Sequence, residues 1–293
     1  MTATTNEPLR DTGSVSMAPT EARRPIDWAR IGAYIVLLLL GVVYLGPLLV
    51  LLNTSFLTPA EFNRSPMTLP SSFSLDNFFE AWDKANFAQY LVNSVLYVVI
   101  STTVFVITGT FLSVAIARRF VRGGGLMFTL FLIALFLPPA LIPQFQLILR
   151  LGLFNNPLGY VMLFVVNPIG IVILVNYIRT IPVELDEAAA IEGAGYLRYV
   201  FQIVMPLAKP AIATVAVLHS IGVWNELILP TIYLTSQEYY PVTRGLIAFQ
   251  GVYGNNWPLL AAGVLMIALP MVVFFIFAQR YIIGGVTAGA VKG

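Results

Sequence analysis

Six long apolar runs are the feature that most limits how this chain can fold. A helix needs about 20 apolar residues to cross about 30 Å of hydrocarbon, and each run is of about that length. Membrane strands would instead appear as alternating segments of about ten residues, which the sequence lacks. The runs cover residues 31–52, 88–117, 126–149, 158–178, 211–234 and 257–283. The sequence therefore predicts an all-α integral membrane protein with six transmembrane helices.

Composition supports a chain that lies almost wholly in the bilayer. Hydrophobic residues make up 58% and charged residues only 10% of the chain, with a mean hydropathy of +0.84, whereas about a quarter of a soluble domain is charged. The net charge of +2 gives no reason to expect a nucleic-acid partner. There is no cysteine, and His219 is the single histidine, so no metal site is expected.

Two tails are expected outside a transmembrane domain that covers residues 31–283. Residues 1–30 are polar and without periodicity, which favours a disordered cytoplasmic tail. A secretory signal is not indicated, because the first apolar run begins late and is too long. Residues 284–293 form a short tail of mainly small residues, which by itself indicates only a flexible end.

The distribution of lysine and arginine predicts the orientation of the spans, because cytoplasmic loops are enriched in both. With the N-terminus inside, 12 of the 16 basic residues lie in cytoplasmic segments and the other four lie outside. The outer four are Arg64, Lys84, Arg150 and Arg244. This orientation places both termini and the polar loop, residues 180–210, in the cytoplasm.

The polar loop has the pattern of two short helices joined at a bend. Pro182 suits the first position of a helix, and acidic residues in the following turn complement the helix dipole. Gly193 and its neighbours end that helix, because glycine tolerates the left-handed backbone of a C-cap. A second short helix follows, because Leu197, Val200, Phe201 and Val204 have the spacing of one apolar helical face.

Two interpretations of this loop follow from the pattern alone. A short helix anchored at both ends to membrane helices can transmit force from a soluble partner into the bilayer. The loop can also be an amphipathic connector that lies on lipid headgroups. Its acidic first turn argues against the second interpretation, because anionic lipid repels carboxylates.

The spacing within the loop resembles the EAA motif of the membrane subunits of binding-protein-dependent ABC importers. Glu192 and Met205 stand where that family usually has Asp and Leu, and neither change alters the geometry of the loop. The residues that carry the resemblance are Glu187, Ala188, Ala189, Gly193, Ala194, Phe201, Ile203 and Pro206. Residues 285–293 and the stretch from Trp224 to Leu227 also resemble segments of MalG-type permease subunits of carbohydrate importers.

The resemblance implies a function and a set of partners. The chain would be a multi-pass permease subunit in the plasma (inner) membrane that moves a sugar, an oligosaccharide or a glycerol-phosphate type solute. The loop would be the coupling helix, with Glu187, Ala188, Ala189, Gly193, Ala194, Phe201 and Pro206 forming the ATPase-coupling surface. The partners would be a second, MalF-like permease subunit, two ATP-binding subunits that hold ATP and Mg, and an extracytoplasmic solute-binding protein.

Polar groups inside the expected spans are candidates for a translocation path or for a subunit interface. A charged residue near mid-bilayer costs roughly 2.5–3.5 kcal/mol and usually faces a water-filled interior. Trp224, Asn225 and Glu226 either border the path or bond across a subunit interface. Pro138, Pro139 and Pro143 are expected to bend the third span beside Gln144. The bent segment either faces a cavity or is an ordinary packing kink. His219 is expected to be a packing residue.

The segment between the first two spans is the longest outer loop. Residues 53–87 contain three prolines, several aromatics and four carboxylates. The segment is either a docking surface for an external binding protein or an ordinary solvated loop. The outer loop over residues 235–256 ends beside Trp257, and its aromatic residues suit the membrane–water interface.

The chain carries no motif for catalysis. The sequence G-x-x-x-x-G-K-S/T does not occur, since Leu126 follows the glycines at 123–125, so ATP cannot bind by a P-loop. There is no nucleophile elbow, no H-E-x-x-H and no cysteine. The chain is therefore expected not to be an enzyme and to hold no cofactor. The alternative is a secondary carrier or channel that acts without an ATPase partner, and a membrane scaffold is a third possibility.

Overall fold

The computed structural model describes residues 28–251 and 254–290 and is almost entirely helical over them. One short antiparallel pair, β1 with β2, interrupts the helices. The elements are α1 (Trp28–Phe56), α2 (Pro59–Arg64), α3 (Asp76–Lys84), α4 (Phe87–Ala117), α5 (Gly124–Ala134), α6 (Leu141–Arg150), α7 (Pro157–Met162), α8 (Pro168–Ile178), α9 (Glu184–Ile191), α10 (Tyr196–Tyr199), η1 (Val200–Val204), α11 (Met205–Leu207), α12 (Lys209–Trp224), α13 (Ile228–Tyr233), η2 (Gln237–Tyr239), α14 (Val242–Gly245), η3 (Leu246–Phe249), β1 (Gln250–Gly251), β2 (Gly254–Asn255) and α15 (Trp257–Ala290).

The chain divides into two compact units, one up to Pro47 and one from Leu48 onward. Helix α1 crosses this boundary, and no residue of the apolar 18-residue window within its segment Arg30–Phe56 is buried. All packing described below lies within the second unit.

Three of the six expected spans are continuous helices in the described part of the chain. The segments Arg30–Phe56, Phe87–Ala117 and Trp257–Arg280 are long and apolar enough to cross a membrane. Each of the other three expected spans is interrupted. The third breaks between α5 and α6, the fourth between α7 and α8, and the fifth between α12 and α13. The described residues therefore hold three continuous helices that are candidates for membrane spans, and six continuous spans are not confirmed.

The interruptions have local causes in the sequence. Pro138 and Pro139 lie between α5 and α6, where proline removes backbone donors and clashes with the preceding turn. Asn167 precedes Pro168 and caps α8, since its side chain accepts a hydrogen bond from Gly170 N. Glu226 lies between α12 and α13 and accepts from the first backbone amides of α13. The expected bend at the prolines is thus a full break.

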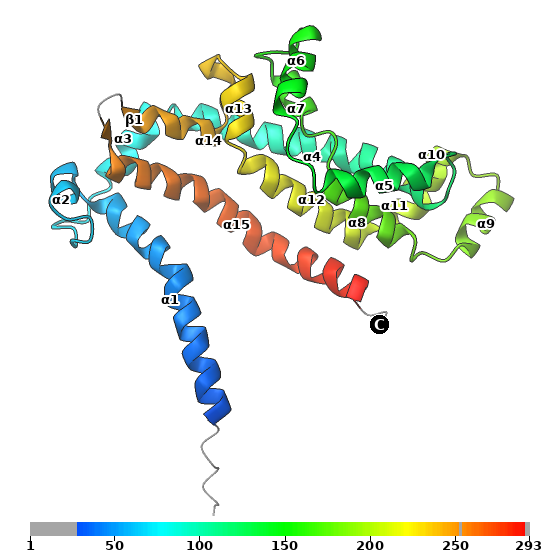
Figure 1. Ribbon diagram of the computed structural model, residues 1–293, viewed down its shortest axis with the longest axis horizontal. Coiled ribbons are helices and arrows are strands. Elements are labelled where there is room, and N and C mark those ends of the chain that lie inside the picture. Colours follow the sequence, from blue (N-terminus) through cyan, green and yellow to red (C-terminus); the bar gives the residue numbers. More distant parts are fainter. Residues whose placement is uncertain (1–27, 252–253, 291–293) are drawn as a thin grey trace, which may run out of the picture. The chain divides into compact units, whose positions relative to one another are not determined.

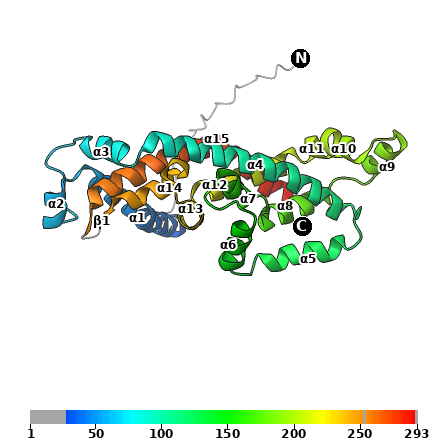
Figure 2. The same cartoon turned by 90° about the horizontal axis from the view of Figure 1, so that it is seen from above.

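Four helices form the centre of the second unit. Helix α4 packs against α8 and α12, and α12 packs against α15. Helix α3 contacts the N-terminal ends of α4 and α15, as both views of the ribbon indicate (Figures 1 and 2). Helix α9 lies at the opposite end of these helices (Figures 1 and 2). The expected outer loop that contains α3 and the polar loop are therefore at opposite ends of the same group of helices.

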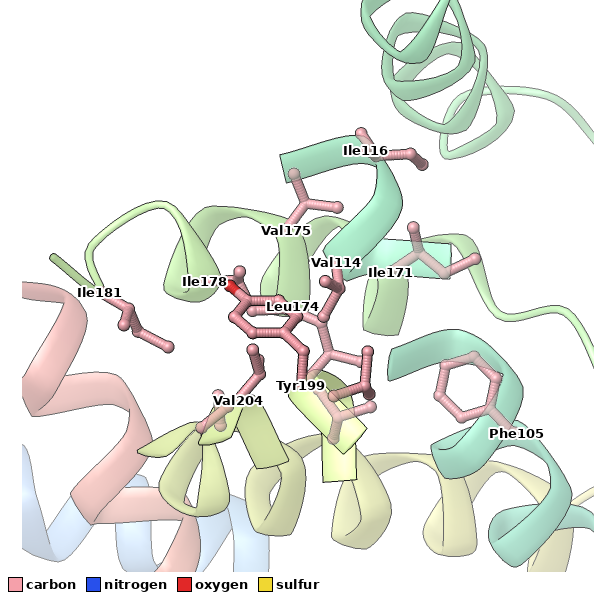
Figure 3. Close-up of a cluster of buried hydrophobic side chains, with 14 of the residues drawn as sticks. Phe105, Val114, Ile116, Ile171, Leu174, Val175, Ile178, Ile181, Tyr199 and Val204 are labelled. Atoms are coloured by element: carbon pink, nitrogen blue, oxygen red, sulfur yellow. The ribbon is translucent and has the colours of Figure 1, made fainter. Parts of the chain in front are cut away.

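The largest apolar core lies at the α9 end, where Tyr199 packs among Leu174, Ile178 and Val204 (Figure 3). It joins the polar loop to three membrane helices. Its buried members are Phe105, Val114, Ile116, Ile171, Leu174, Val175, Ile178, Ile181, Ala189, Tyr199, Val200, Val204, Ala208, Ala211 and Val215. Close-packed interiors transmit strain, so the loop and the ends of α4, α8 and α12 are expected to move together.

The predictions for the two terminal tails compare differently with the structure. Most of the predicted disordered tail, residues 1–27, lies outside the described residues, and α1 begins at Trp28. The sixth expected span ends at residue 283, but α15 continues to Ala290. No proline follows residue 283, and each glycine there costs only about 1 kcal/mol relative to alanine in a helix. The helix therefore extends through most of the short segment that was expected to be a flexible end.

Candidate functional site

Helix α9 begins the polar loop with three carboxylates in its first turn: Glu184, Asp186 and Glu187. The sequence predicts Pro182 as the first residue of this helix. The helix starts two residues later, at Glu184, and Val183 occupies the N-cap position. This shift places the carboxylates at the N-terminal end, where the helix dipole stabilises negative charge.

The end of α9 shows the helix C-cap that was predicted at Gly193. Its φ of +68° lies in the left-handed region, which glycine enters without steric cost. Gly193 N donates to Ala190 O at 3.1 Å, and Ala194 N donates to Ala189 O at 3.0 Å. This pair of bonds is a Schellman motif, which turns the chain sharply at a helix end.

The second half of the loop is one short helical run with an unusual centre. Helices α10 and α11 flank the π-helical turn η1, a rare form that is frequent at functional sites. The run meets α12 at 85° across a break at Ala208, a residue that is fully buried. Tyr196 Oη donates to Phe111 O on α4 at 2.6 Å, and the Phe201 ring packs edge-on against Phe111 at 5.1 Å.

An ion pair ties α9 to the end of α4. Arg118 Nε lies 2.9 Å from Asp186 Oδ2, and Arg118 Nη2 donates to Ile181 O at 3.0 Å. Tyr199 Oη donates to the other oxygen of Asp186. Burial, followed by this bond to Asp186, raises the pKa of the Tyr199 phenol. The side chains of Arg118 and Asp186 are only 6% and 21% exposed, so solvent screens the pair weakly.

The residues predicted to form the coupling surface divide between solvent and core. Glu187, Ala188 and Gly193 are exposed, and Ile191 beside them is 88% exposed. Ala189 is buried in the apolar core. The remaining members are Ala194, half-buried; Phe201, packed on α4; and Pro206, exposed in α11.

A concave surface of about 440 Å³ lies on the inner side of the bend. Asp186 and the alanines of α9 form one wall, and three aromatic rings form the other. The lining residues are Phe120, Asp186, Ala189, Ala190, Ala194, Tyr196 and Tyr199. The exposed edge of α9 and this concavity together give the loop a shaped surface of alternating apolar and acidic character.

A second polar site lies where the break between α7 and α8 meets the break between α12 and α13. Asn167, His219 and Glu226 line a depression of about 200 Å³. Asn167 Nδ2 and His219 Nδ1 are 3.1 Å apart, and His219 stacks on Phe105 with ring centroids 4.6 Å apart. The histidine therefore packs in the protein interior and also presents one edge to the depression.

The other residues predicted for a translocation path or a subunit interface lie away from this depression. Trp224 is buried and lines an apolar groove of about 420 Å³ formed by α4, α12 and α15. Asn225 is exposed. Gln144 accepts a hydrogen bond from Tyr233 Oη at 3.4 Å and so joins α6 to α13. Of the four predicted residues, only Glu226 lies at the polar depression.

Two residues of these places were not predicted from the sequence. Asn167 precedes a proline inside an apolar run, and this pair is a signal for a capped helix start within a span. Arg118 follows an apolar run directly, but nothing in the sequence identifies Asp186 as its partner. In the described part of the chain, no group of three or more acidic or histidine side chains could hold a metal ion.

The chain matches a family profile described as the inner membrane component of binding-protein-dependent transport systems, over residues 87–282. It is 32% identical to the melibiose/raffinose/stachyose import permease protein MelC of Bacillus subtilis, covering 84% of this chain and 91% of the relative. It is 30% identical to the diacetylchitobiose uptake permease NgcG of Streptomyces coelicolor, covering 89% and 88%.

A further relative is the arabinooligosaccharide permease AraQ of Halalkalibacterium halodurans, 34% identical over 84% of this chain and 91% of the relative. One solved structure, a bacterial ABC transporter involved in the import of alginate, matches with a TM-score of 0.77 at 22% identity. That match covers 90% of this chain and 99% of the solved one, and it establishes a common fold.

Proposed function

Because the chain belongs to the family of inner membrane components of binding-protein-dependent transport systems, we propose that it imports a carbohydrate with energy from ATP. The relatives named above import sugars and oligosaccharides, which supports a solute of that class. Members of this family are transport components without an ATPase site, so ATP and Mg belong to two partner subunits. A second permease subunit and an external solute-binding protein complete the assembly.

The observation that carries this proposal is the shared core between the polar loop and the membrane helices. Ala189, Tyr199 and Ala208 of the loop are buried together with residues of α4, α8 and α12. Glu187, Ile191 and the exposed Gly193 remain free to contact an ATP-binding subunit. A displacement of the exposed surface must therefore move the ends of three membrane helices together.

The charge distribution supports a cytoplasmic position for this loop. Arg118, Arg179 and Lys209 follow or begin α4, α8 and α12 at the end of the helices where α9 lies. Basic residues of this kind favour the cytoplasmic side of a membrane. Both chain termini would then be cytoplasmic.

We assign the polar depression to the translocation path. Irregular backbone at membrane depth is stable only where it is buried in protein or lines a water-filled cavity, and discontinuous helices often form transport sites. The breaks before Pro168 and before Ile228 meet at Asn167, His219 and Glu226. An amide, an imidazole and a carboxylate offer the donors and acceptors that sugar hydroxyls require. We assign the exposed Asn225 to the interface with the second permease subunit.

The first experiment substitutes Gly193 in the chain assembled with its partner subunits in proteoliposomes. Gly193→Val forces a β-branched residue to φ of +68°, at a cost of roughly 1–2 kcal/mol. That strain lowers the ratio of the native bend to other conformations of the loop about 5–30-fold. We expect ATP-driven uptake and the binding of the ATP-binding subunits to fall. Gly193→Asn is the matched control, because asparagine tolerates the left-handed region.

A second arm of the experiment separates this function from the alternative. Vesicles that contain the chain alone are expected to show no solute uptake with or without ATP. Uptake by the chain alone would identify a secondary carrier or channel. Full coupling in the Gly193→Val variant would remove the polar loop from the mechanism.

A further inference from the structure

Helix α3 is anchored in the second unit by one buried face. Ala81 is fully buried and packs with Phe249, Leu259 and Ala262. The Asn77 side chain donates to the carbonyls of Ser55 and Leu57 at 2.8 and 2.9 Å. These contacts fix the rotation of α3 about its own axis, so the directions of its other two faces are set.

The second face of α3 is acidic and exposed. Asp76, Glu80 and Asp83 lie on it at helical spacing, and Lys84 forms an i,i+4 ion pair with Glu80. Ionised carboxylates are costly to remove from water. This face must therefore remain in contact with aqueous solution.

The third face lies between these two and is apolar yet exposed. Leu75, Phe79 and Trp82 follow each other at i, i+4 and i+7, with exposed fractions of 53%, 68% and 42%. Such spacing places them in one row along the helix. The preceding segment extends the apolar surface with Met67, Leu69 and Phe73, which are more than 70% exposed. Exposed apolar surface of this extent marks an interaction site.

The position of α3 identifies what this face meets. Helix α3 contacts the first turns of both α4 and α15, two helices long enough to span the membrane. The Trp82 ring lies 5.1 Å from the ring of Phe87, the first residue of α4. Trp257, the first residue of α15, stacks on Phe62 at 6.4 Å. Trp82 and Trp257 thus both lie at the level where the spans begin, and tryptophan is enriched at membrane–water interfaces.

We propose that α3 is an interfacial helix, with Leu75, Phe79 and Trp82 inserted at the boundary between lipid headgroups and acyl chains. Its acidic face then points to water, and its buried face holds α4 and α15. Val92 and Leu96 of α4 are also exposed. Apolar area rather than charge supplies the affinity, because the polar face is acidic and gains nothing from anionic lipid. The helix would fix the depth of two spans in the bilayer.

The test uses the natural absence of cysteine from the chain. Phe79→Cys, Trp82→Cys and Asp83→Cys each create one thiol for a nitroxide label, and Asp83→Cys on the acidic face is the matched control. The labelled full-length chain is reassembled with its unlabelled partner subunits in phosphatidylcholine vesicles. Electron paramagnetic resonance then measures collisions of the label with oxygen, which partitions into lipid, and with a water-soluble nickel chelate.

The proposal predicts opposite signs for the two faces. Labels at positions 79 and 82 should collide more with oxygen than with the nickel chelate, and the label at position 83 should show the reverse. Two outcomes would overturn the proposal. Nickel collision at position 79 equal to that at position 83 would place the apolar face in water. Low collision with both reagents at positions 79 and 82 would show that a protein subunit covers it.

Discussion

Arg118 joins the polar loop directly to a membrane helix. It ends α4, pairs with Asp186 of α9 and donates to the Ile181 carbonyl between α8 and α9. One guanidinium therefore fixes three segments, which a lysine ammonium could not do with the same planar geometry. In the proposed mechanism Arg118 acts through its position rather than through contact with a partner.

Replacement of Arg118 by Met should weaken both stability and coupling. Asp186 would lose its charge partner in a poorly solvated place, which costs about 1–3 kcal/mol. We expect a lower thermal unfolding midpoint and ATP hydrolysis that no longer follows solute delivery. Arg122→Met, at an exposed arginine in the next loop, is the control. If Arg118→Met remained fully coupled, the ion pair would have no role in transmission.

The double variant Arg118→Met with Asp186→Asn separates charge from shape. Removing both charges should recover part of the stability lost in Arg118→Met, because no unpaired carboxylate remains. Recovery of stability without recovery of coupling would assign the ion pair a mechanical role. A double variant no more stable than Arg118→Met would contradict the electrostatic explanation.

At the scale of elements, the starts of α7 and α8 offer a matched comparison. Asn156 and Asn167 both cap a helix that begins with proline, but only Asn167 lines the polar depression. Replacing either with alanine should lower stability by about 0.5–2 kcal/mol. Only Asn167→Ala should also raise the KM for uptake across a panel of labelled oligosaccharides. Equal uptake kinetics in the two variants would remove the depression from the path.

Helix α2 has a start that depends on pH. Hydrogen bonds from Ser71 and then Thr58 lower the pKa of the Glu61 carboxyl from 4.5 to about 2. Because the folded pKa lies below the unfolded value, this contribution to stability is complete above pH 4.5 and is lost as the pH falls towards 2. Amide exchange at Thr58, corrected for its intrinsic rate, should increase across that range.

The control for α2 is Glu61→Gln, which cannot ionise. Its amide exchange at Thr58 should be faster than in the natural chain at neutral pH and should lack the acid-dependent increase. A midpoint near 4.5 in the natural chain would show that the capping box of α2 does not depress the pKa of Glu61.

The elements were predicted unevenly, for identifiable reasons. The continuous spans at α4 and α15 carry no internal polar break before their ends, so length and hydropathy locate them. The bend at Gly193 was predictable because only a left-handed residue closes that helix end. The breaks before Pro168 and Ile228 were missed, because they depend on side-chain caps from Asn167 and Glu226. The hydropathy pattern of a span does not show which polar side chains cap a helix within it.

At the scale of the whole chain, the sequence identified the class of protein and one of its two polar places. The proposed coupling surface follows a linear motif, so the sequence alone predicts its residues. The depression combines residues from α8, α12 and the segments beside them, and one sequence does not reveal which distant residues meet. For the same reason the sequence could not show that Trp224 and Gln144, predicted for a translocation path or a subunit interface, lie in an apolar groove and between two helices.

The sharp angle between the helical segments on either side of Ala208 determines which displacement of the loop can be transmitted to α12. The helical run before it and the helix after it cross at 85°, so a push along the first axis has almost no component along the second. Helix α12 is then swung sideways and is not drawn deeper or shallower. Under such a push the residues of α12 would keep their depth in the bilayer while the helix shifts within the membrane plane.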